Sequence, residues 1–280
     1  SIIDQEKCIK CGRCASVCSY NAIIIQERPC AKACGMDAIT SDENGKANID
    51  YDKCVSCGQC LVNCPFGAIA DKSQIFQTIR AIQSGEKVYA AVAPAFVGQF
   101  GPKVTPGKLR AAMKELGFAD VFEVAIGADL CAKQEAEDFL KEVPDELPFM
   151  ATSCCPAWVK FITDQYKEYV PNISTCRSPQ GMLSAVIKEY FREPEHAAGK
   201  KTVMISIMPC TAKKAEAIRP NSFTDGEQDT DIVITTTELL RMIDNFGIDF
   251  AALDPEACDM PFGFGSGGGV IFGVTGGVTE

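Results

Sequence analysis

The sequence has few of the features that mark nucleic-acid-binding or membrane proteins. Acidic residues outnumber basic ones by 37 to 27, the net charge is −10, and no basic patch is present to offset phosphate. We therefore expect no nucleic-acid partner. The longest apolar runs, such as residues 203–209, are too short to span a bilayer, and no secretory signal is recognisable. We therefore expect a cytoplasmic protein with no membrane partner.

Histidine, tryptophan and phosphate-loop motifs are also scarce. The only histidine, His196, lies in a polar Glu-Pro-Glu-His segment that we interpret as a surface loop. The only tryptophan, Trp158, is expected to pack beneath a cysteine-bearing loop. The glycine run 265–269 lacks the Lys-[Ser/Thr] ending and the GxGxxG spacing of phosphate loops, so nucleotide binding is not expected.

Cysteine, in contrast, is abundant, with sixteen in 280 residues and ten of them in the first 64. Eight of these ten form two tight CxxCxxCxxxC runs, 8–18 and 54–64. Such close spacing suits several thiolates on one iron–sulfur cluster better than disulfides between distant loops. Zinc fits tandem four-cysteine runs less well. Labile clusters and reduced thiolates indicate a reducing, anaerobic cytoplasm.

The two runs form an internal repeat, each with an acidic residue shortly before it, Asp4 or Asp52. The repeat predicts an α+β two-[4Fe–4S] ferredoxin-like domain over residues 1–75. In two-cluster ferredoxins the fourth cysteine of each run ligates the other cluster. That rule assigns one [4Fe–4S] cluster to Cys8, Cys11, Cys14 and Cys64, and the other to Cys54, Cys57, Cys60 and Cys18. Ser19 follows the first run where proline is usual, as at Pro65.

Cys30 and Cys34 form an extra CxxxC that resembles the end of another ferredoxin run. They could replace one of the assigned ligands or help to hold a third cluster. The interpretation we favour at this point is that they are non-ligating residues of an inserted loop.

Beyond residue 76 the pattern changes to apolar runs that alternate with helical periodicity, which predicts an α/β domain with parallel strands over 76–280. The predicted strands are 88–93, 121–125 and 203–208, and the predicted helices are 74–82, 106–116, 128–141 and 237–246. Active sites in such domains are built on the loops at strand ends.

Two cysteine-bearing loops of this domain are predicted at strand-to-helix junctions, where helix amides favour a thiolate. One loop carries Cys154 and Cys155 after the strand-like residues 148–150, and the other carries Cys210 after strand 203–208. From spacing alone these are candidate metal-ligating or reactive thiols, and buried inert cysteines remain the alternative.

The first loop, Thr152-Ser-Cys-Cys-Pro-Ala-Trp158, resembles the first active-site signature of [FeFe] (iron-only) hydrogenases, and Met208-Pro-Cys-Thr-Ala-Lys-Lys-Ala-Glu216 resembles the second. The resemblance extends to residues 93–95, 127–130, 176–180, 236–239 and 269–278, and so covers nearly the whole chain. Ala157 stands where many members have glycine.

The resemblance implies an H-cluster, a [4Fe–4S] cube bridged to a two-iron unit with CO, cyanide and a dithiolate. By motif position, Cys155 and Cys210 would ligate the cube and Cys154 would pass protons. Lys213 would donate to a cyanide, and Met208 and Pro94 would pack around the two-iron unit. The family's other two cube ligands lie in a third motif that is absent here, so we expect a truncated chain that is inactive by itself.

The resemblance also implies a reaction and its partners. The enzyme would interconvert protons and H₂, with electrons relayed through the two front clusters from a ferredoxin-like carrier, after H-cluster maturation proteins had loaded the site. The proton path would use Glu135, Ser178 and Asp138. The alternatives are a hydrogen sensor, an iron–sulfur assembly protein and a simple electron-transfer protein.

Overall fold

The computed structural model describes residues 3–4, 7–9, 11–20, 22–23 and 28–256. The chain divides into two compact units. The first comprises Ser1–Cys54 and Gln59–Ala70, and the second comprises Val55–Gly58 and Asp71–Glu280.

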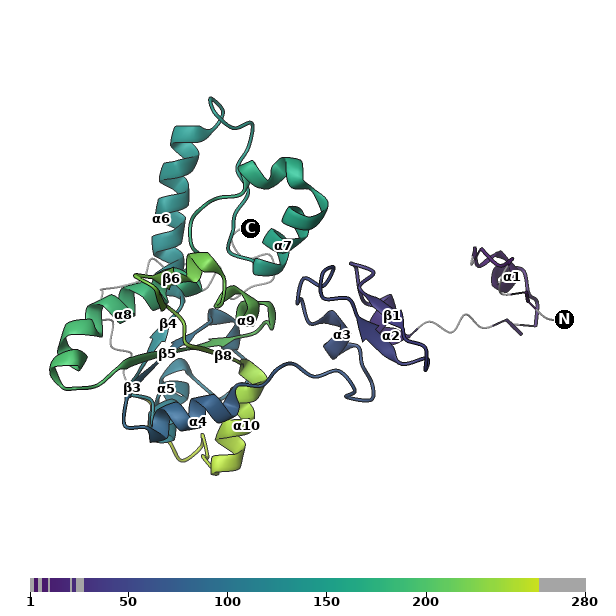
Figure 1. Ribbon diagram of the computed structural model, residues 1–280. Coiled ribbons are helices and arrows are strands. Elements are labelled where there is room, and N and C mark those ends of the chain that lie inside the picture. Colours follow the sequence, from purple (N-terminus) through teal and green to yellow (C-terminus); the bar gives the residue numbers. More distant parts are fainter. Residues whose placement is uncertain (1–2, 5–6, 10, 21, 24–27, 257–280) are drawn as a thin grey trace. The chain divides into compact units, whose positions relative to one another are not determined.

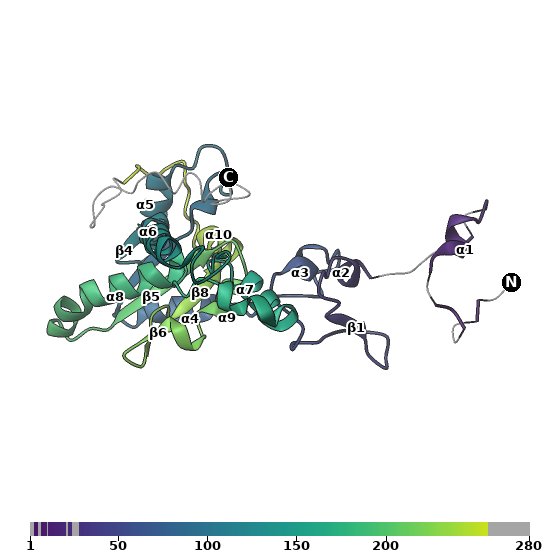
Figure 2. The same ribbon diagram turned by 90° about the horizontal axis from the view of Figure 1, so that it is seen from above.

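The first unit is small and built from short elements. Its helices are α1 (Arg13–Ser16), α2 (Pro29–Lys32) and α3 (Gln59–Val62), and its strands are β1 (Ile39–Ser41) and β2 (Ala47–Ile49). The strands form an antiparallel hairpin in which Ile39 pairs with Ile49. Helix α2 lies against both α3 and β1 (Figure 1; Figure 2). Few of its described side chains are buried, among them Cys30, Ala38 and Ile39.

A four-stranded parallel sheet in the order β4-β3-β5-β8 forms the centre of the second unit. The strands are β4 (Asp120–Glu123), β3 (Lys87–Val92), β5 (Thr202–Met208) and β8 (Ile232–Thr235). The central strands β3 and β5 are buried on both faces, which their nearly continuous apolar sequences permit.

Helices cover both faces of this sheet. Helices α4 (Ile75–Gln83), α5 (Pro106–Leu116) and α10 (Thr236–Phe246) pack on one face, and α6 (Ala125–Glu142) and α8 (Pro179–Ala197) lie on the other (Figure 1). The other elements are η1 (Pro94–Phe96), α7 (Pro156–Gln165), η2 (Lys167–Asn172), α9 (Ala212–Glu216), η3 (Pro220–Ser222), β6 (Phe223–Thr224) and β7 (Glu227–Gln228). The two layers of helices leave the carboxyl ends of the strands to the loops that carry the cysteine motifs.

Most elements predicted for this unit are present, and the parallel α/β architecture is confirmed. The predicted strand 121–125 is shorter because Ala125 already begins α6. Residues 148–150 are not a strand; next to them only Ala151 makes an isolated bridge, to Ile173. The interpretation of residues around His196 as a loop is wrong, because α8 runs through Pro194 to Ala197.

Some predictions fall outside the described residues. They concern the glycine-rich segment 263–278 and Cys258, and the side chain of His196 is not described either. Within the described part of the chain, no helix combines the length and apolarity needed to cross a membrane.

Candidate functional site

The carboxyl ends of the two central strands bring two predicted site residues to the same edge of the sheet. Val92 of β3 pairs in register with Ile207 of β5, and the Ala93 amide donates to the Ile207 carbonyl at 3.0 Å. Pro94 and Met208 therefore follow neighbouring strands at one edge. This is the edge at which open α/β sheets carry their ligands.

The first cysteine loop leads directly into α7. Cys155 is the N-cap residue with extended backbone angles, and Pro156 occupies the first helical position, where its missing N–H is not needed. Ser153 Oγ donates to the Cys176 carbonyl at 2.6 Å and fixes the start of the loop. The Cys155 thiol makes no capping bond to the helix and is exposed, so it is available as a ligand.

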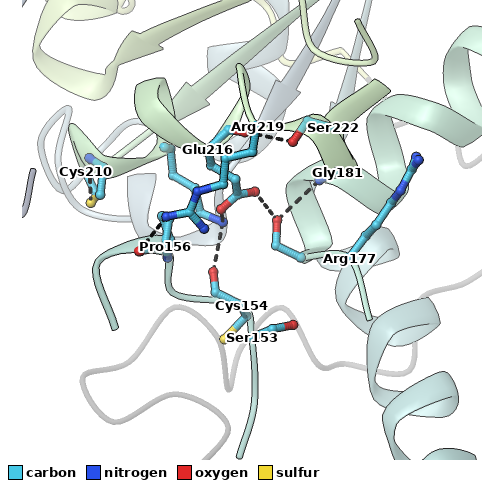
Figure 3. A network of polar contacts seen from close by, with 12 residues as sticks. Ser153, Cys154, Pro156, Arg177, Gly181, Cys210, Glu216, Arg219 and Ser222 are labelled. Carbon is cyan, nitrogen blue, oxygen red and sulfur yellow. Dashed lines mark hydrogen bonds and ion pairs between the residues drawn. The ribbon is translucent and has the colours of Figure 1, made fainter. Parts of the chain in front are cut away.

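Two cations of the second motif region hold the first loop on either side of Cys155. Lys213 Nζ donates to the Cys154 carbonyl and Arg219 donates to the Pro156 carbonyl, both at 2.9 Å (Figure 3). These bonds connect segments that lie more than fifty residues apart in the sequence. The two cysteine motifs thus form one site.

The environment of Cys210 fits a cluster-ligating thiolate. Burial raises the pKa of Cys210, the amides of Ala212 and Lys213 and the Lys213 charge lower it, and the charge of Cys155 raises it further. The Ala212 amide lies 3.3 Å from the Cys210 Sγ. Amides that point at cysteine sulfur are typical of iron–sulfur ligation. The predicted ligands Cys155 and Cys210 would supply two of the four thiolates that a cube takes.

Glu216 lies at the end of the second motif and holds the Lys213 side chain, and the sequence alone assigned it no role. Its carboxylate accepts hydrogen bonds from Ser178 Oγ and, at 2.7 Å, from Lys213 Nζ (Figure 3). Its carbonyl accepts from Ser222 Oγ at 2.7 Å. Lys213 thus uses two of its three N–H donors on protein oxygens. The only sequence signal was the position of Glu216 at the end of the second motif.

A second group of side chains lies between α6 and the loop that precedes α8. The sulfurs of Cys131 and Cys176 are 3.7 Å apart, and their ligand atoms and that of Glu135 all lie within 4.8 Å of one another. Burial, the Glu135 carboxylate and Cys176 raise the pKa of Cys131, and Cys154 contributes in the same direction. Cys154, the predicted proton-passing thiol, and Glu135, a predicted relay carboxylate, thus both raise the pKa of Cys131.

The predicted relay residues divide into two groups in the structure. Burial raises the pKa of Cys176, a hydrogen bond with Cys131 lowers it, and the Glu135 and Asp138 carboxylates of α6 raise it further. Asp138 also accepts a hydrogen bond from Gln134 at 2.9 Å. Ser178, in contrast, bonds to Glu216 and accepts from the Gly181 amide at 3.3 Å.

Cysteine sulfurs of the first unit also accept amide hydrogen bonds. The Ala68 amide lies 3.3 Å from Cys64 Sγ, and the Ala38 amide lies 3.4 Å from Cys34 Sγ. Hydrogen bonds from the amides of Phe66 and Ala68 lower the pKa of Cys64. A thiolate stabilised in this way fits the cluster-ligating role that the sequence predicts for Cys64.

Comparison with known proteins agrees with this geometry. Residues 86–280 match the family described as iron only hydrogenase large subunit, C-terminal domain. Residues 7–68 match the 4Fe-4S dicluster domain, so the first unit is of the two-[4Fe–4S] type.

Three curated relatives illustrate the range of the match. The chain is 39% identical over 288 residues to iron hydrogenase 1 of Clostridium pasteurianum, covering 99% of this chain and 50% of that protein. It is 37% identical over 298 residues to NADP-reducing hydrogenase subunit HndD of Solidesulfovibrio fructosivorans, covering 100% and 50%. It is 31% identical over 169 residues to cytosolic iron-sulfur assembly component 3 of Bos taurus, covering 58% and 36%.

The fold has solved counterparts. The structure of apo [FeFe]-hydrogenase HydA1 from Chlamydomonas reinhardtii aligns with a TM-score of 0.61 at 32% identity, covering 71% of this chain and 56% of that one. The chain spans about half the length of the first two curated relatives.

Proposed function

From the premise that this chain belongs to the iron-only hydrogenase family, we propose that it carries the hydrogen-activating site of an enzyme that interconverts protons and H₂. The observation that carries the proposal is the convergence of the two cysteine motifs. Lys213 of the second motif donates to the Cys154 carbonyl of the first at 2.9 Å, and Arg219, shortly after the second motif, donates to the Pro156 carbonyl at 2.9 Å.

The residues divide the work of such a site. Cys155 and Cys210 hold the cube of the H-cluster, which when bound supplies the metal centre at which two protons and two electrons combine. Lys213 orients a cyanide ligand with a charge-assisted hydrogen bond, and Glu216 positions the Lys213 ammonium at 2.7 Å. Pro94 and Met208 pack around the two-iron unit and exclude water.

Cys154 exchanges protons with the site, and Glu135 and Asp138 carry them towards the surface. Transfer between Cys154 and Glu135 is supported by Cys131, whose pKa both groups raise and whose sulfur lies within 4.8 Å of the Glu135 carboxylate. Ser178 hydrogen-bonds to Glu216, which holds Lys213, so in this scheme Ser178 helps to position Lys213.

Electrons reach the site through the two [4Fe–4S] clusters of the first unit from a ferredoxin-like carrier. Loading of the two-iron unit requires maturation proteins. Labile iron–sulfur clusters and their thiolate ligands suit a reducing cytoplasm.

The test is hydrogen evolution by the full-length, matured protein with a reduced carrier. Cys154→Ala should lower the rate by roughly 10²–10⁴-fold, because it removes a positioned proton donor. The CO and cyanide infrared bands should remain in this variant. Cys155→Ala should lose these bands together with activity, because it removes a ligand of the cube.

The same experiment separates the rival functions. An assembly protein or a simple electron carrier would give no CO and cyanide bands after maturation of the wild type. A sensor would give the bands without appreciable turnover. Unimpaired hydrogen evolution by Cys154→Ala would contradict the proposed proton role.

A further inference from the structure

The extra pair of cysteines, Cys30 and Cys34, lies in a segment that folds like the end of the second CxxCxxCxxxC run. Cys30 lies in the one-turn helix α2, as Cys60 lies in the one-turn helix α3. The Cys34 amide donates to the carbonyl three residues before it at 3.1 Å, and the Cys64 amide does the same at 3.4 Å.

The correspondence continues after each final cysteine. Asp37 and Gly67, each three residues further on, both have left-handed backbone angles, with φ of 48° and 62°. The next amides, of Ala38 and Ala68, point at the cysteine sulfurs over 3.4 and 3.3 Å. A residue with a side chain rarely adopts positive φ. Aspartate adopts this conformation more readily than most residues. At Asp37, as at Gly67 of the second run, the positive φ turns the next amide towards the cysteine sulfur.

The two segments are also neighbours in space. Helix α2 packs against α3 within the first unit (Figure 2). In a two-cluster ferredoxin, the runs whose ends pack together exchange their fourth cysteines between the clusters. The sequence-based pairing took the first run, 8–18, as the partner of the second. The structure places the CxxxC segment of α2 in that position.

We propose that Cys34, in place of Cys18, is the fourth ligand of the cluster held by Cys54, Cys57 and Cys60, and that Cys30 joins Cys64 in ligating the other cluster. The first run then supplies the remaining ligands of the cluster that Cys30 and Cys64 hold. Each thiol loses its proton on binding iron. The Ala38 amide then faces the Cys34 thiolate, as the Ala68 amide faces the Cys64 thiolate. Cys30 is buried at 8% exposure, which suits a ligand enclosed between a cluster and the β1–β2 hairpin side of the unit.

The test compares alanine variants of the full-length protein by iron and sulfide content and by electron paramagnetic resonance of the reduced clusters. Cys60→Ala is the reference for loss of the cluster held by the second run, and it should lower the iron content by about four atoms per chain. Cys34→Ala should reproduce the iron content and spectrum of Cys60→Ala, and Cys30→Ala should reproduce those of Cys64→Ala. Cys131→Ala controls for the loss of a buried thiol that ligates no cluster.

The rival pairing makes the opposite prediction. If Cys18→Ala reproduces Cys60→Ala while Cys34→Ala keeps the wild-type iron and spectrum, the proposal is overturned. Cys34→Asp provides a check that does not depend on cluster loss, because aspartate can remain an anionic ligand. It should retain more iron than Cys34→Ala but shift the resonance of one cluster. A resonance identical to wild type in an iron-replete Cys34→Asp protein would also refute ligation.

Discussion

Glu216 is a buried carboxylate that fixes the side chains around it. Only 8% of the residue is exposed, and burial of a carboxylate is costly unless its oxygens are hydrogen-bonded. Ser178 and Lys213 provide these bonds. Lys213 in turn is only 14% exposed in its side chain, so the two charges depend on each other.

Replacement of Glu216 by glutamine should therefore destabilise the second unit and displace Lys213. We expect a loss of about 3 kcal/mol in the free energy of unfolding, because the change leaves a buried ammonium without its counter-ion. Urea unfolding followed by circular dichroism measures it. Glu137→Gln, an exposed change on α6, is the matched control and should differ from wild type by less than about 0.5 kcal/mol. Equal stabilities of the two variants would contradict the role assigned to Glu216.

The thiols of Cys131 and Cys176 should resist alkylation at neutral pH. Burial is the main cause of the raised pKa of both thiols. The reactive thiolate therefore forms only at a pH above the range in which cysteine usually ionises. Mass spectrometry of tryptic peptides after timed iodoacetamide treatment would follow each site. We expect modification of both to lag behind the exposed Cys155 in unloaded protein and to accelerate with pH. Early, pH-independent labelling of Cys131 would show that the thiol is not buried as described.

At the scale of elements, helix α10 is fixed by an N-terminal capping box that also joins three parts of the second unit. Thr235 Oγ accepts from the Glu238 amide at 3.2 Å, and the Glu238 carboxylate accepts from the Thr235 amide at 2.6 Å. The same carboxylate binds Lys214 at 2.8 Å and the Gln74 amide at 3.0 Å. Burial alone would raise the pKa of Glu238, but these bonds outweigh it, and the pKa lies below its ordinary value of 4.5.

The stabilisation by Glu238 should consequently depend on pH. Because the folded pKa is depressed, the contribution is complete above the ordinary glutamate value and is lost as the pH falls through the folded pKa. At neutral pH, Glu238→Gln should cost about 2 kcal/mol, because it removes the charge-assisted bond to Lys214, which keeps Asp71 at 2.8 Å as its other carboxylate partner. The difference from wild type should narrow at acid pH in urea titrations. Thr235→Ala should cost about 1 kcal/mol at every pH, and a Glu238→Gln penalty that is equally flat would refute the explanation.

The sequence predicted elements best where their ends carry local signals. Helix 106–116 was predicted with its observed bounds because Thr105 caps it, Pro106 begins it and Gly117 ends it with a φ of 107°. Helix α8 was not predicted. It continues through Pro194 to Ala197, although a proline inside a helix removes one backbone hydrogen bond.

Contacts between distant segments could not be read from the sequence. Cys131 and Cys176 meet only because α6 and α8 approach closely, and this approach depends on Gly127. A Cβ at that position would lie 2.1 Å from the Pro179 carbonyl oxygen. The motifs gave the identities of Cys154, Cys155 and Cys210, but the linkage of their loops by Lys213 and Arg219 depends on the packing of α7 against α9.

At the scale of the whole molecule, the two units differ in what stabilises them. The second unit has a buried apolar cluster on each face of its sheet. The first has few buried side chains among its described residues, and large apolar side chains such as Tyr20, Val62 and Phe66 are exposed by 91%, 78% and 86%. A domain with so small a core needs metal centres to remain folded.

Removal of iron should therefore unfold the first unit selectively. After treatment with a chelator and an oxidant, limited proteolysis should cleave within residues 1–70 and leave a resistant fragment that contains the parallel sheet. Mass spectrometry of the fragments over time would map the cuts. Simultaneous cleavage of both units, or resistance of the iron-free first unit to the protease, would contradict this difference in stability.

The two hydrogen bonds on either side of Cys155 have a consequence for the speed of electron transfer. Lys213 and Arg219 hold the carbonyls of the residues before and after this cysteine, so its backbone is constrained in both directions. A ligand whose main chain is fixed in this way shifts little when the charge on its metal changes, and fixed dipoles need little rearrangement. Under the proposed function, in which Cys155 ligates the cube, the loop would favour a low reorganisation energy and let electrons arrive and leave at a small driving force.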